Sequence, residues 1–97
     1  MKKCYIAGFI GDLPKSEYET NFLIAKREVE KLGYQPVSPT EMLHDHGHTW
    51  CEYLKEDLTE MLKCDAVYAL RNWRKSPGAT LEINLALNLG INIIHQI

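Results

Sequence analysis

The sequence has little of what would mark a membrane protein, a secreted protein or a nucleic-acid binder. No apolar run approaches the roughly 20 residues that span a bilayer, and Met1-Lys2-Lys3 leads directly into a strand-like segment without a signal peptide. The formal net charge is −2, whereas a dedicated nucleic-acid binder should carry a basic face. The 3 cysteines include no CxxC pair, which favours reduced thiols over a disulfide framework. We therefore expect a cytoplasmic protein that binds neither membranes nor nucleic acid.

Familiar signatures of cofactor and metal sites are also missing. The loop 8–13 contains two glycines but neither the GxGxxG of dinucleotide-binding proteins nor the GK[ST] of a P-loop. His44, His46 and His48 resemble a metal cluster, yet they lack the HExxH spacing and the CxxC partners of zinc sites. Alternating histidines in a polar loop are usually solvated. We therefore expect no metal site, with a metal centre on these three histidines as the alternative.

What the 97 residues do contain is a regular alternation of strand and helix patterns in a chain the size of one domain, 1–97. Apolar runs predict four strands, the last two of them buried, at 3–7, 34–37, 64–70 and 91–94. Apolar residues at spacings of three and four predict three helices, at 16–33, 49–62 and 81–89. The segment Ser16-Glu17-Tyr18-Glu19 fits a capping box that would open the first helix.

This order of elements predicts the fold and the place of a site. Strands and helices that alternate through right-handed crossovers form a three-layer α/β/α sandwich, flavodoxin- or Rossmann-like, here with a small parallel sheet of about four strands in the order 2-1-3-4. Ligands bind such sheets at the carboxyl ends of the strands, where the strand order reverses. Loops 8–13 and 71–78 should converge there. The stretch 76–82 would aim the N–H groups and positive dipole end of the last helix into the crevice.

Glu82 occupies an unusual position on the last helix. Thr80, Asn84 and Asn88 recur every four residues as one polar stripe. Glu82 lies about 160° from Thr80 and Asn84 on a helical wheel, so its carboxylate shares the apolar side of the helix. The alternative is a first-turn Glu that only complements the helix dipole.

Asp57 is misplaced in the same way on the helix 49–62. It lies within roughly 60° of Trp50 and Tyr53 on a wheel, although it could instead cap or pair locally. A carboxylate in a partly apolar crevice can act as a nucleophile or as a general acid. Glycoside chemistry uses such residues, because a carboxylate stabilises or captures the oxocarbenium-like centre. We therefore single out Glu82 and Asp57 as a candidate catalytic pair.

Aromatic and basic residues near the crevice give further candidates. Tyr5, near the end of the first strand, could orient a carboxylate, although a tyrosine in a strand is more often part of the core. Trp50 and Trp73 could each stack on a base, or could pack in the core or in an interface. The basic residues that could contact a phosphate, or could simply be solvated, are Arg71, Arg74 and Lys75.

Six short motifs occur in order along nearly the whole chain. They are YIAG from Tyr5, NF from Asn21, GYQPVSP from Gly33, WCEYLKEDL from Trp50, CDAV from Cys64 and WRKSPGATLE from Trp73. The ordered set resembles the small nucleoside 2-deoxyribosyltransferase-like domains, including the uncharacterised DUF4406 group of bacteria and their phages. Active members of this family split or exchange the N-glycosidic bond of 2′-deoxynucleosides or of their monophosphates.

The resemblance implies an N-glycosidase or deoxyribosyltransferase in which Glu82 is the nucleophile and forms a covalent deoxyribosyl-enzyme. Asp57 would hold the sugar or shuttle the proton of the leaving base, and Tyr5 would orient Glu82. The residues that would contact the nucleoside or nucleotide are Gly8, Phe9, Trp50, Trp73, Ser76 and Gly78. The resemblance also implies no metal or organic cofactor, and a homodimer or larger homo-oligomer. The alternative is a non-catalytic module of the same fold that binds a nucleoside or nucleotide.

The loop 8–13 departs from the deoxynucleotide-hydrolase branch of this family, whose first loop is Gly-rich and carries an Arg for the phosphate. Here the loop has no Arg and contains Asp12, which would repel a phosphate. A phosphorylated substrate would therefore need its positive charge from Arg71 or Arg74.

Overall fold

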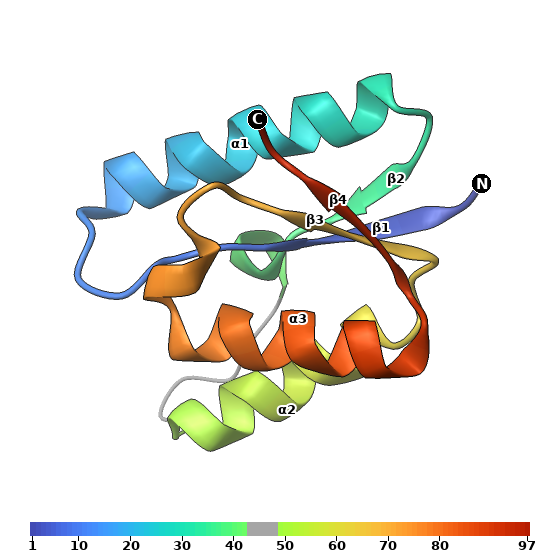
Figure 1. Cartoon of the computed structure of the whole chain (residues 1–97). Coiled ribbons are helices and arrows are strands. Elements are labelled where there is room, and N and C mark those ends of the chain that lie inside the picture. Colours follow the sequence, from blue (N-terminus) through green and yellow to red (C-terminus); the bar gives the residue numbers. More distant parts are fainter. Residues whose placement is uncertain (43–48) are drawn as a thin grey trace.

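The computed structural model, which describes residues 1–42 and 49–97, is a four-stranded parallel sheet with helices on both faces (Figure 1). The elements are β1 (Lys3–Ala7), α1 (Lys15–Lys31), β2 (Gln35–Val37), the short 3-10 helix η1 (Pro39–Glu41), α2 (Trp50–Met61), β3 (Ala66–Ala69), the short 3-10 helix η2 (Trp73–Lys75), α3 (Pro77–Leu89) and β4 (Asn92–His95). Within the described ranges, no helix combines the length and apolarity needed to cross a bilayer.

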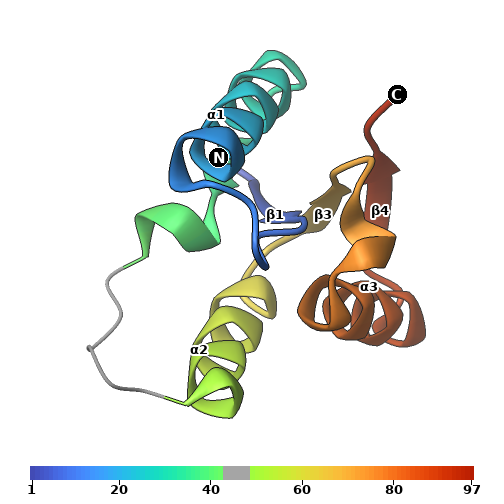
Figure 2. The same ribbon diagram turned by 90° about the vertical axis from the view of Figure 1, so that its left-hand side faces the viewer.

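The sheet order is β2-β1-β3-β4, and every neighbouring pair of strands is parallel. Figure 2 shows α1 on one face of the sheet and both α2 and α3 on the other. The predicted flavodoxin-like α/β/α sandwich and its strand order 2-1-3-4 are therefore confirmed. The order reverses between β1 and β3, so their carboxyl ends mark the crevice in which such folds bind ligands.

The two central strands send alternate side chains to opposite faces, and this alternation decides what reaches the crevice. On β1, Cys4 and Ile6 pack in the core cluster that Phe22 and other residues of α1 complete. Tyr5 and Ala7 pack in the second cluster, beneath α2 and α3. Tyr5 is thereby directed to the face that carries α3.

Helix α1 begins differently from the prediction. Its first residue is Lys15, after Pro14, and no side chain caps it. The capping box predicted at Ser16 is therefore wrong, because Pro14, with φ −54°, already supplies helix-like φ and a carbonyl for the first turn. A reciprocal capping box occurs instead at α2, between Thr49 and Glu52.

Strand β4 was predicted to be buried, and it is not. It forms the edge of the sheet beside β3, with Ile93 and Ile94 half-buried and Asn92 and His95 exposed. An edge strand has a neighbour on one side only, so an apolar run there is shielded less than the same run in β3, whose four residues are all buried.

Candidate active site

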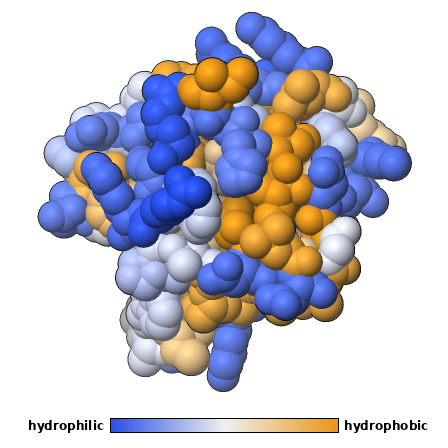
Figure 3. Space-filling model, in the orientation of Figure 1, coloured by the Kyte–Doolittle hydropathy of each residue, from blue (hydrophilic) through white to orange (hydrophobic). Residues whose placement is uncertain are grey.

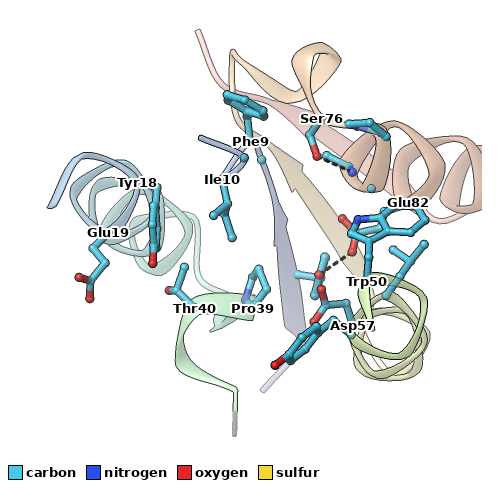
Figure 4. A pocket seen from close by; sticks show the side chains of 18 of the residues that line it. Phe9, Ile10, Tyr18, Glu19, Pro39, Thr40, Trp50, Asp57, Ser76 and Glu82 are labelled. Carbon is cyan, nitrogen blue, oxygen red and sulfur yellow. Dashed lines mark hydrogen bonds between the residues drawn. The ribbon is translucent and has the colours of Figure 1, made fainter. Parts of the chain in front are cut away.

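A cavity of about 620 Å³ opens at the carboxyl edge of the sheet, between the start of α1, helix α2 and the start of α3. Its wall includes most of the residues singled out from the sequence: Tyr5, Gly8, Phe9, Trp50, Asp57, Ser76, Gly78 and Glu82. Figure 4 shows the labelled side chains around this space. The fold therefore brings together side chains from β1, the following loop, α2 and α3.

Glu82 is a buried carboxyl group on the inner face of α3. Only 4% of the residue is exposed, and it shares the buried side of the helix with Ala79, Ile83 and Ala86. Because α3 begins at Pro77, Glu82 lies in the second turn, and the first turn contains no acidic residue. The alternative of a solvated first-turn Glu is therefore wrong.

Tyr5 holds one oxygen of this carboxyl group. The Tyr5 hydroxyl donates a hydrogen bond of 2.7 Å to Glu82 Oε2, in the buried interior (Figure 4). Burial and the nearby carboxylates raise the pKa of the Tyr5 hydroxyl well above its ordinary value, so Tyr5 stays protonated and remains a donor. The second oxygen, Oε1, is left for other partners.

The proton affinity of Glu82 is strongly shifted. Burial raises the pKa of Glu82 to about 8, the hydrogen bond from Tyr5 opposes that rise, and the charge of Asp57 adds to it. A carboxyl group with a pKa near neutrality changes its protonation within the physiological range. Such perturbed groups in clefts are concentrated at functional sites.

Asp57 comes to the same cavity from α2. The residue is half-buried, and its Oδ1 atom is shielded from solvent. Figure 4 shows the Asp57 and Glu82 side chains reaching the same space from α2 and α3. Its charge raises the pKa of both Glu82 and Tyr5. Two acidic side chains from separate helices therefore do face one cavity.

The start of α3 forms another part of the wall. Ser76 caps the helix, with its hydroxyl oxygen accepting from the Ala79 N–H at 3.0 Å, and Thr80 N–H donates to the Ser76 carbonyl. Pro77 has no N–H. In the part of the chain that the structure describes, the Gly78 N–H is thus the donor of this first turn for which no protein acceptor occurs.

Gly78 differs from Gly8, although both line the cavity. A Cβ at Gly8 would stand 2.3 Å from Leu70 Cδ1, so packing requires the glycine. A Cβ at Gly78 would meet nothing closer than 3.8 Å. Neither packing nor a positive φ requires a glycine at 78, and its missing side chain leaves room above the helix start on the cavity side.

Two aromatic residues flank the opening. Trp50, the first residue of α2, is 60% exposed and lines the cavity beside Gly78. Phe9 lines it from the loop after β1, where the Phe9 N–H donates to Asn72 Oδ1 at 3.1 Å. Both residues therefore belong to the wall of the cavity, and a contact with a ligand stays a prediction.

Trp73 and the neighbouring cations lie elsewhere. Trp73 packs against the core cluster under α3, with its ring 6.5 Å from that of His95, and is not part of the cavity wall. The Arg74 guanidinium lies 4.8 Å from the Trp73 ring centroid. Arg71 Nη2 donates to the Ile97 carbonyl. A substrate contact through Trp73 stays a prediction from the sequence.

Several lining residues were missed. Lys15 is the one cation among the described residues of the wall, and Tyr18, Thr40 and Tyr53 also contribute. Sequence reasoning looked for a cation in the loop 8–13, whereas Lys15 follows it as the first residue of α1. The position of Lys15 just after Pro14, at a helix start facing the crevice, was the available signal.

The proposed histidine cluster is not tested. His44, His46 and His48 lie outside the described residues. Among residues 1–42 and 49–97, no group of His, Cys, Asp and Glu is arranged to hold a metal ion.

Solved structures share this fold at low sequence identity. A 2-deoxyribosyltransferase from Bacillus psychrosaccharolyticus matches with a TM-score of 0.71 at 18% identity, over 96% of this chain and 70% of that protein. A 2-desoxiribosyltransferase from Leishmania mexicana matches with 0.69 at 21%, over 98% and 63%. A conserved protein from Enterococcus faecalis V583 matches with 0.68 at 23%, over 98% and 62%. The chain thus spans about two thirds of the length of these proteins.

No curated protein matches the sequence significantly. A family model for a domain of unknown function, DUF4406, matches residues 2–95, which is nearly the whole chain. The protein is therefore a member of the DUF4406 family.

Proposed function

We propose that this domain cleaves or transfers at the N-glycosidic bond of a 2′-deoxynucleoside or its 5′-monophosphate. The observation that supports it most is the buried Glu82 carboxyl, held by Tyr5 and facing a cavity that it shares with Asp57. The fold likeness to two 2-deoxyribosyltransferases supports the same reaction class. Each named residue has a distinct role in the proposed reaction.

Glu82 acts as the nucleophile. Because Tyr5 occupies Oε2, the free oxygen Oε1 attacks the anomeric carbon of the sugar. The bond from that carbon to the base nitrogen breaks, and its electron pair leaves with the base. An ester between Glu82 and the sugar forms. The proton that Glu82 holds in the empty site passes first to Asp57, which then delivers it to the leaving base nitrogen. The Tyr5 hydrogen bond keeps the attacking group in one orientation.

The second step releases the sugar. A water molecule, or the nitrogen of a second base, attacks the same carbon, and the Glu82 carboxylate departs. Asp57 takes up the proton that the incoming group loses, which restores the starting state. Water gives a hydrolase, and a second base gives a transferase. The cavity is open to solvent, and the geometry suits either acceptor.

The wall of the cavity supplies binding contacts. The Gly78 N–H and the Ser76 hydroxyl at the start of α3 would donate to an oxygen of the sugar or its phosphate. Lys15 would supply positive charge to a phosphorylated substrate. Phe9 and Trp50 would contact the faces of the base, because aromatic rings stack on bases without regard to sequence.

The test measures release of free base by chromatography from deoxynucleosides and deoxynucleoside monophosphates, with and without an acceptor base. Wild type should release base, and Glu82→Gln should lose at least about a thousandfold in rate, because the amide cannot form the ester. Glu19→Gln, a matched change at an exposed part of the same wall, should retain activity. Equal release by wild type and Glu82→Gln would overturn the proposal.

A non-catalytic binding module is the second candidate function. It is favoured by the pKa of Glu82, because a value of about 8 leaves the empty site mostly protonated at neutral pH. A nucleoside or nucleotide at ten times its dissociation constant would then stabilise the fold by about 1.4 kcal/mol without any product. Thermal unfolding with each ligand, run beside the product assay, separates the two functions.

The domain is also proposed to form a homo-oligomer through α3. Figure 3 shows apolar surface gathered over α3 and β4. Leu81, Leu87 and Leu89 are exposed, and the helix contains a single charged residue, Glu82, which is buried. An uncharged face can pair with its own copy without repulsion. Leu87→Glu should lower the mass measured by light scattering, and an unchanged mass would contradict this interface.

A further inference from the structure

A second cavity lies at the same edge of the sheet, on the face covered by α1. Its volume is about 380 Å³, and its wall comes from α1, from the segment after β3 and from the end of the chain. Among residues 1–42 and 49–97, Arg71 and Lys75 are its charged residues, and no carboxylate side chain lines it. This cavity plays no part in the proposed reaction, and no residue is shared between the two walls.

The charged side chains of this wall are both cations, and one carboxylate, that of Glu28, lies behind Gln96. In the described part of the chain, neither Arg71 nor Lys75 forms an ion pair with an Asp or Glu side chain. Glu28 lies outside the wall and keeps its negative charge while it accepts from Tyr68 Oη at 3.1 Å and from Gln96 Nε2 at 2.8 Å. Arg71 gives one donor to a backbone carbonyl, which leaves most of its guanidinium hydrogens available.

The polar groups of the wall are two cations and three amides, those of Asn21, Asn72 and Gln96. Gln96 is held on both sides of its amide, since its Oε1 accepts from the Arg71 N–H and its Nε2 donates to Glu28. Asn72 uses its oxygen to accept from the Phe9 N–H, so its NH₂ group remains as a donor. Leu70 and Ile24 form an apolar part of the wall. Donors and positive charge together select an anion with several acceptor oxygens.

We propose that this second cavity binds a small phosphate-type oxyanion, either inorganic phosphate or the phosphate group of an ester. The Arg71 guanidinium and the Lys75 ammonium would supply the charge, and the Asn72 amide would supply a further donor. A cavity of about 380 Å³ has room for a phosphate with a small organic group attached. The proposal does not rest on any turnover at Glu82.

The second cavity is one side chain away from the first. Asn72 lines the second cavity and holds Phe9, which lines the first. Leu70 lines the second cavity and packs so closely on Gly8 that a Cβ there would stand 2.3 Å away. An anion bound at the Asn72 NH₂ group should therefore alter the hydrogen bond that the same amide accepts from Phe9.

The test is an NMR titration of the ¹⁵N-labelled protein with inorganic phosphate and, separately, with glycerol 3-phosphate. Ionic strength is held constant with chloride, because surface electrostatics are screened by salt. Saturable shifts are expected at the Asn72 side-chain amide, the Arg71 backbone amide and the Phe9 amide. The tighter of the two ligands identifies whether free phosphate or an ester is preferred.

Matched variants separate this site from general attraction to a cation. Arg71→Gln combined with Lys75→Gln should weaken binding by about tenfold or more. Lys2→Gln combined with Lys31→Gln removes the same charge from residues that do not line the cavity, and should leave the affinity unchanged. Equal weakening in both variants, shifts that do not saturate, or shifts centred on Gly78 and Lys15 would overturn the proposal.

Discussion

Two cavities lie at one edge of the sheet, and their charged groups differ in sign and in burial. The first, beneath α2 and α3, buries the carboxyl group of Glu82 and places Asp57 beside it. The second, beneath α1, carries Arg71 and Lys75, both exposed. Burying an ionisable group is costly unless it is hydrogen-bonded, whereas an exposed cation retains most of its hydration. Folding therefore removes hydration from Glu82 in the first cavity, whereas Arg71 and Lys75 in the second cavity stay exposed to water.

This contrast separates chemistry from binding. A buried carboxyl with a shifted pKa can change its protonation and its reactivity, as nucleophiles and general acids must. Exposed cations such as Arg71 and Lys75 can attract and orient an anion. We therefore expect substitutions in the first cavity to change rates and pKa values, and substitutions in the second to change affinity for anions alone.

The largest effect after loss of the nucleophile is expected from Asp57→Asn. A positioned acid or base contributes about 10²- to 10⁴-fold to a rate, so base release should fall by this order. Because the charge of Asp57 raises the pKa of Glu82, the same variant should lower that pKa. Glu60→Gln, on α2 but outside the cavity wall, should change neither quantity. A full rate in Asp57→Asn would remove Asp57 from the mechanism.

The next effect is a pH dependence of stability that Glu82 imposes. Its pKa of about 8 in the folded protein lies above the ordinary 4.5, so the folded state holds a proton that the unfolded state has released. The contribution of Glu82 to stability is therefore present below about 4.5 and is lost as the pH rises through 8. Each pKa unit corresponds to about 1.4 kcal/mol, so the loss should be on the order of a few kcal/mol.

Urea unfolding of wild type and Glu82→Gln at a series of pH values measures this contribution. The difference in unfolding free energy between the two proteins should shift in favour of Glu82→Gln from pH 5 to pH 8, because the amide does not titrate. Parallel stability curves would show that Glu82 titrates alike in the folded and unfolded states.

A smaller effect is expected from Tyr5→Phe, with the opposite sign on the pKa. The Tyr5 hydroxyl donates to Glu82 Oε2 and lowers the pKa of Glu82, so removing it should raise that pKa further. Hydrogen bonds to charged groups contribute about 1.5–3 kcal/mol, which corresponds to a rate loss of about 10- to 100-fold. Tyr34→Phe, in the other core cluster, serves as the control. A lower Glu82 pKa in Tyr5→Phe would contradict this geometry.

Gly78→Ala should weaken binding without weakening the fold. An added methyl group occupies space over the start of α3, so KM should rise by about tenfold, while stability should stay the same or gain up to about 1 kcal/mol. Gly8→Ala is the contrast, because its Cβ would collide with Leu70 and should destabilise the protein. Loss of stability in Gly78→Ala would mean that the glycine serves packing rather than a ligand.

The smallest effect on the reaction is expected from the second cavity. In phosphate-free buffer, Arg71→Gln combined with Lys75→Gln should change base release by less than about twofold, because independent sites contribute additively. A loss of rate comparable to that of Tyr5→Phe would show that the second cavity contributes to the reaction, and the two sites would then not be independent.

The features that follow from local pattern could be predicted from the sequence. Helical periodicity located Glu82 and Asp57 on the wrong side for solvated acids, and the place of Tyr5 near the end of the first strand indicated that it could orient a carboxylate. The bounds of β1 were predicted correctly at residues 3–7. These signals suffice because the helical and strand periods determine which side chains share a face, and the right-handed crossover rule determines on which side of the sheet each helix packs.

The features that depend on tertiary neighbours could not be predicted. Lys15 lines the first cavity because α1 begins after Pro14, and a capping motif at Ser16 suggested a later start. Trp73 packs on the core because η2 turns it away from the cavity, which no periodicity records. The wall of the second cavity combines residues of α1 with Gln96, and these residues come together only in the folded structure.

The Glu82 carboxyl group is buried in a cavity with Tyr5 and Asp57, and we propose that this environment makes it reactive. A ¹³C NMR titration of the Glu82 side-chain carboxyl in the ligand-free wild-type protein tests it most directly, with Glu82→Gln to assign the signal. The account predicts a titration midpoint at a pKa of about 8. A pKa near the ordinary 4.5 would place Glu82 in solvent and contradict the account.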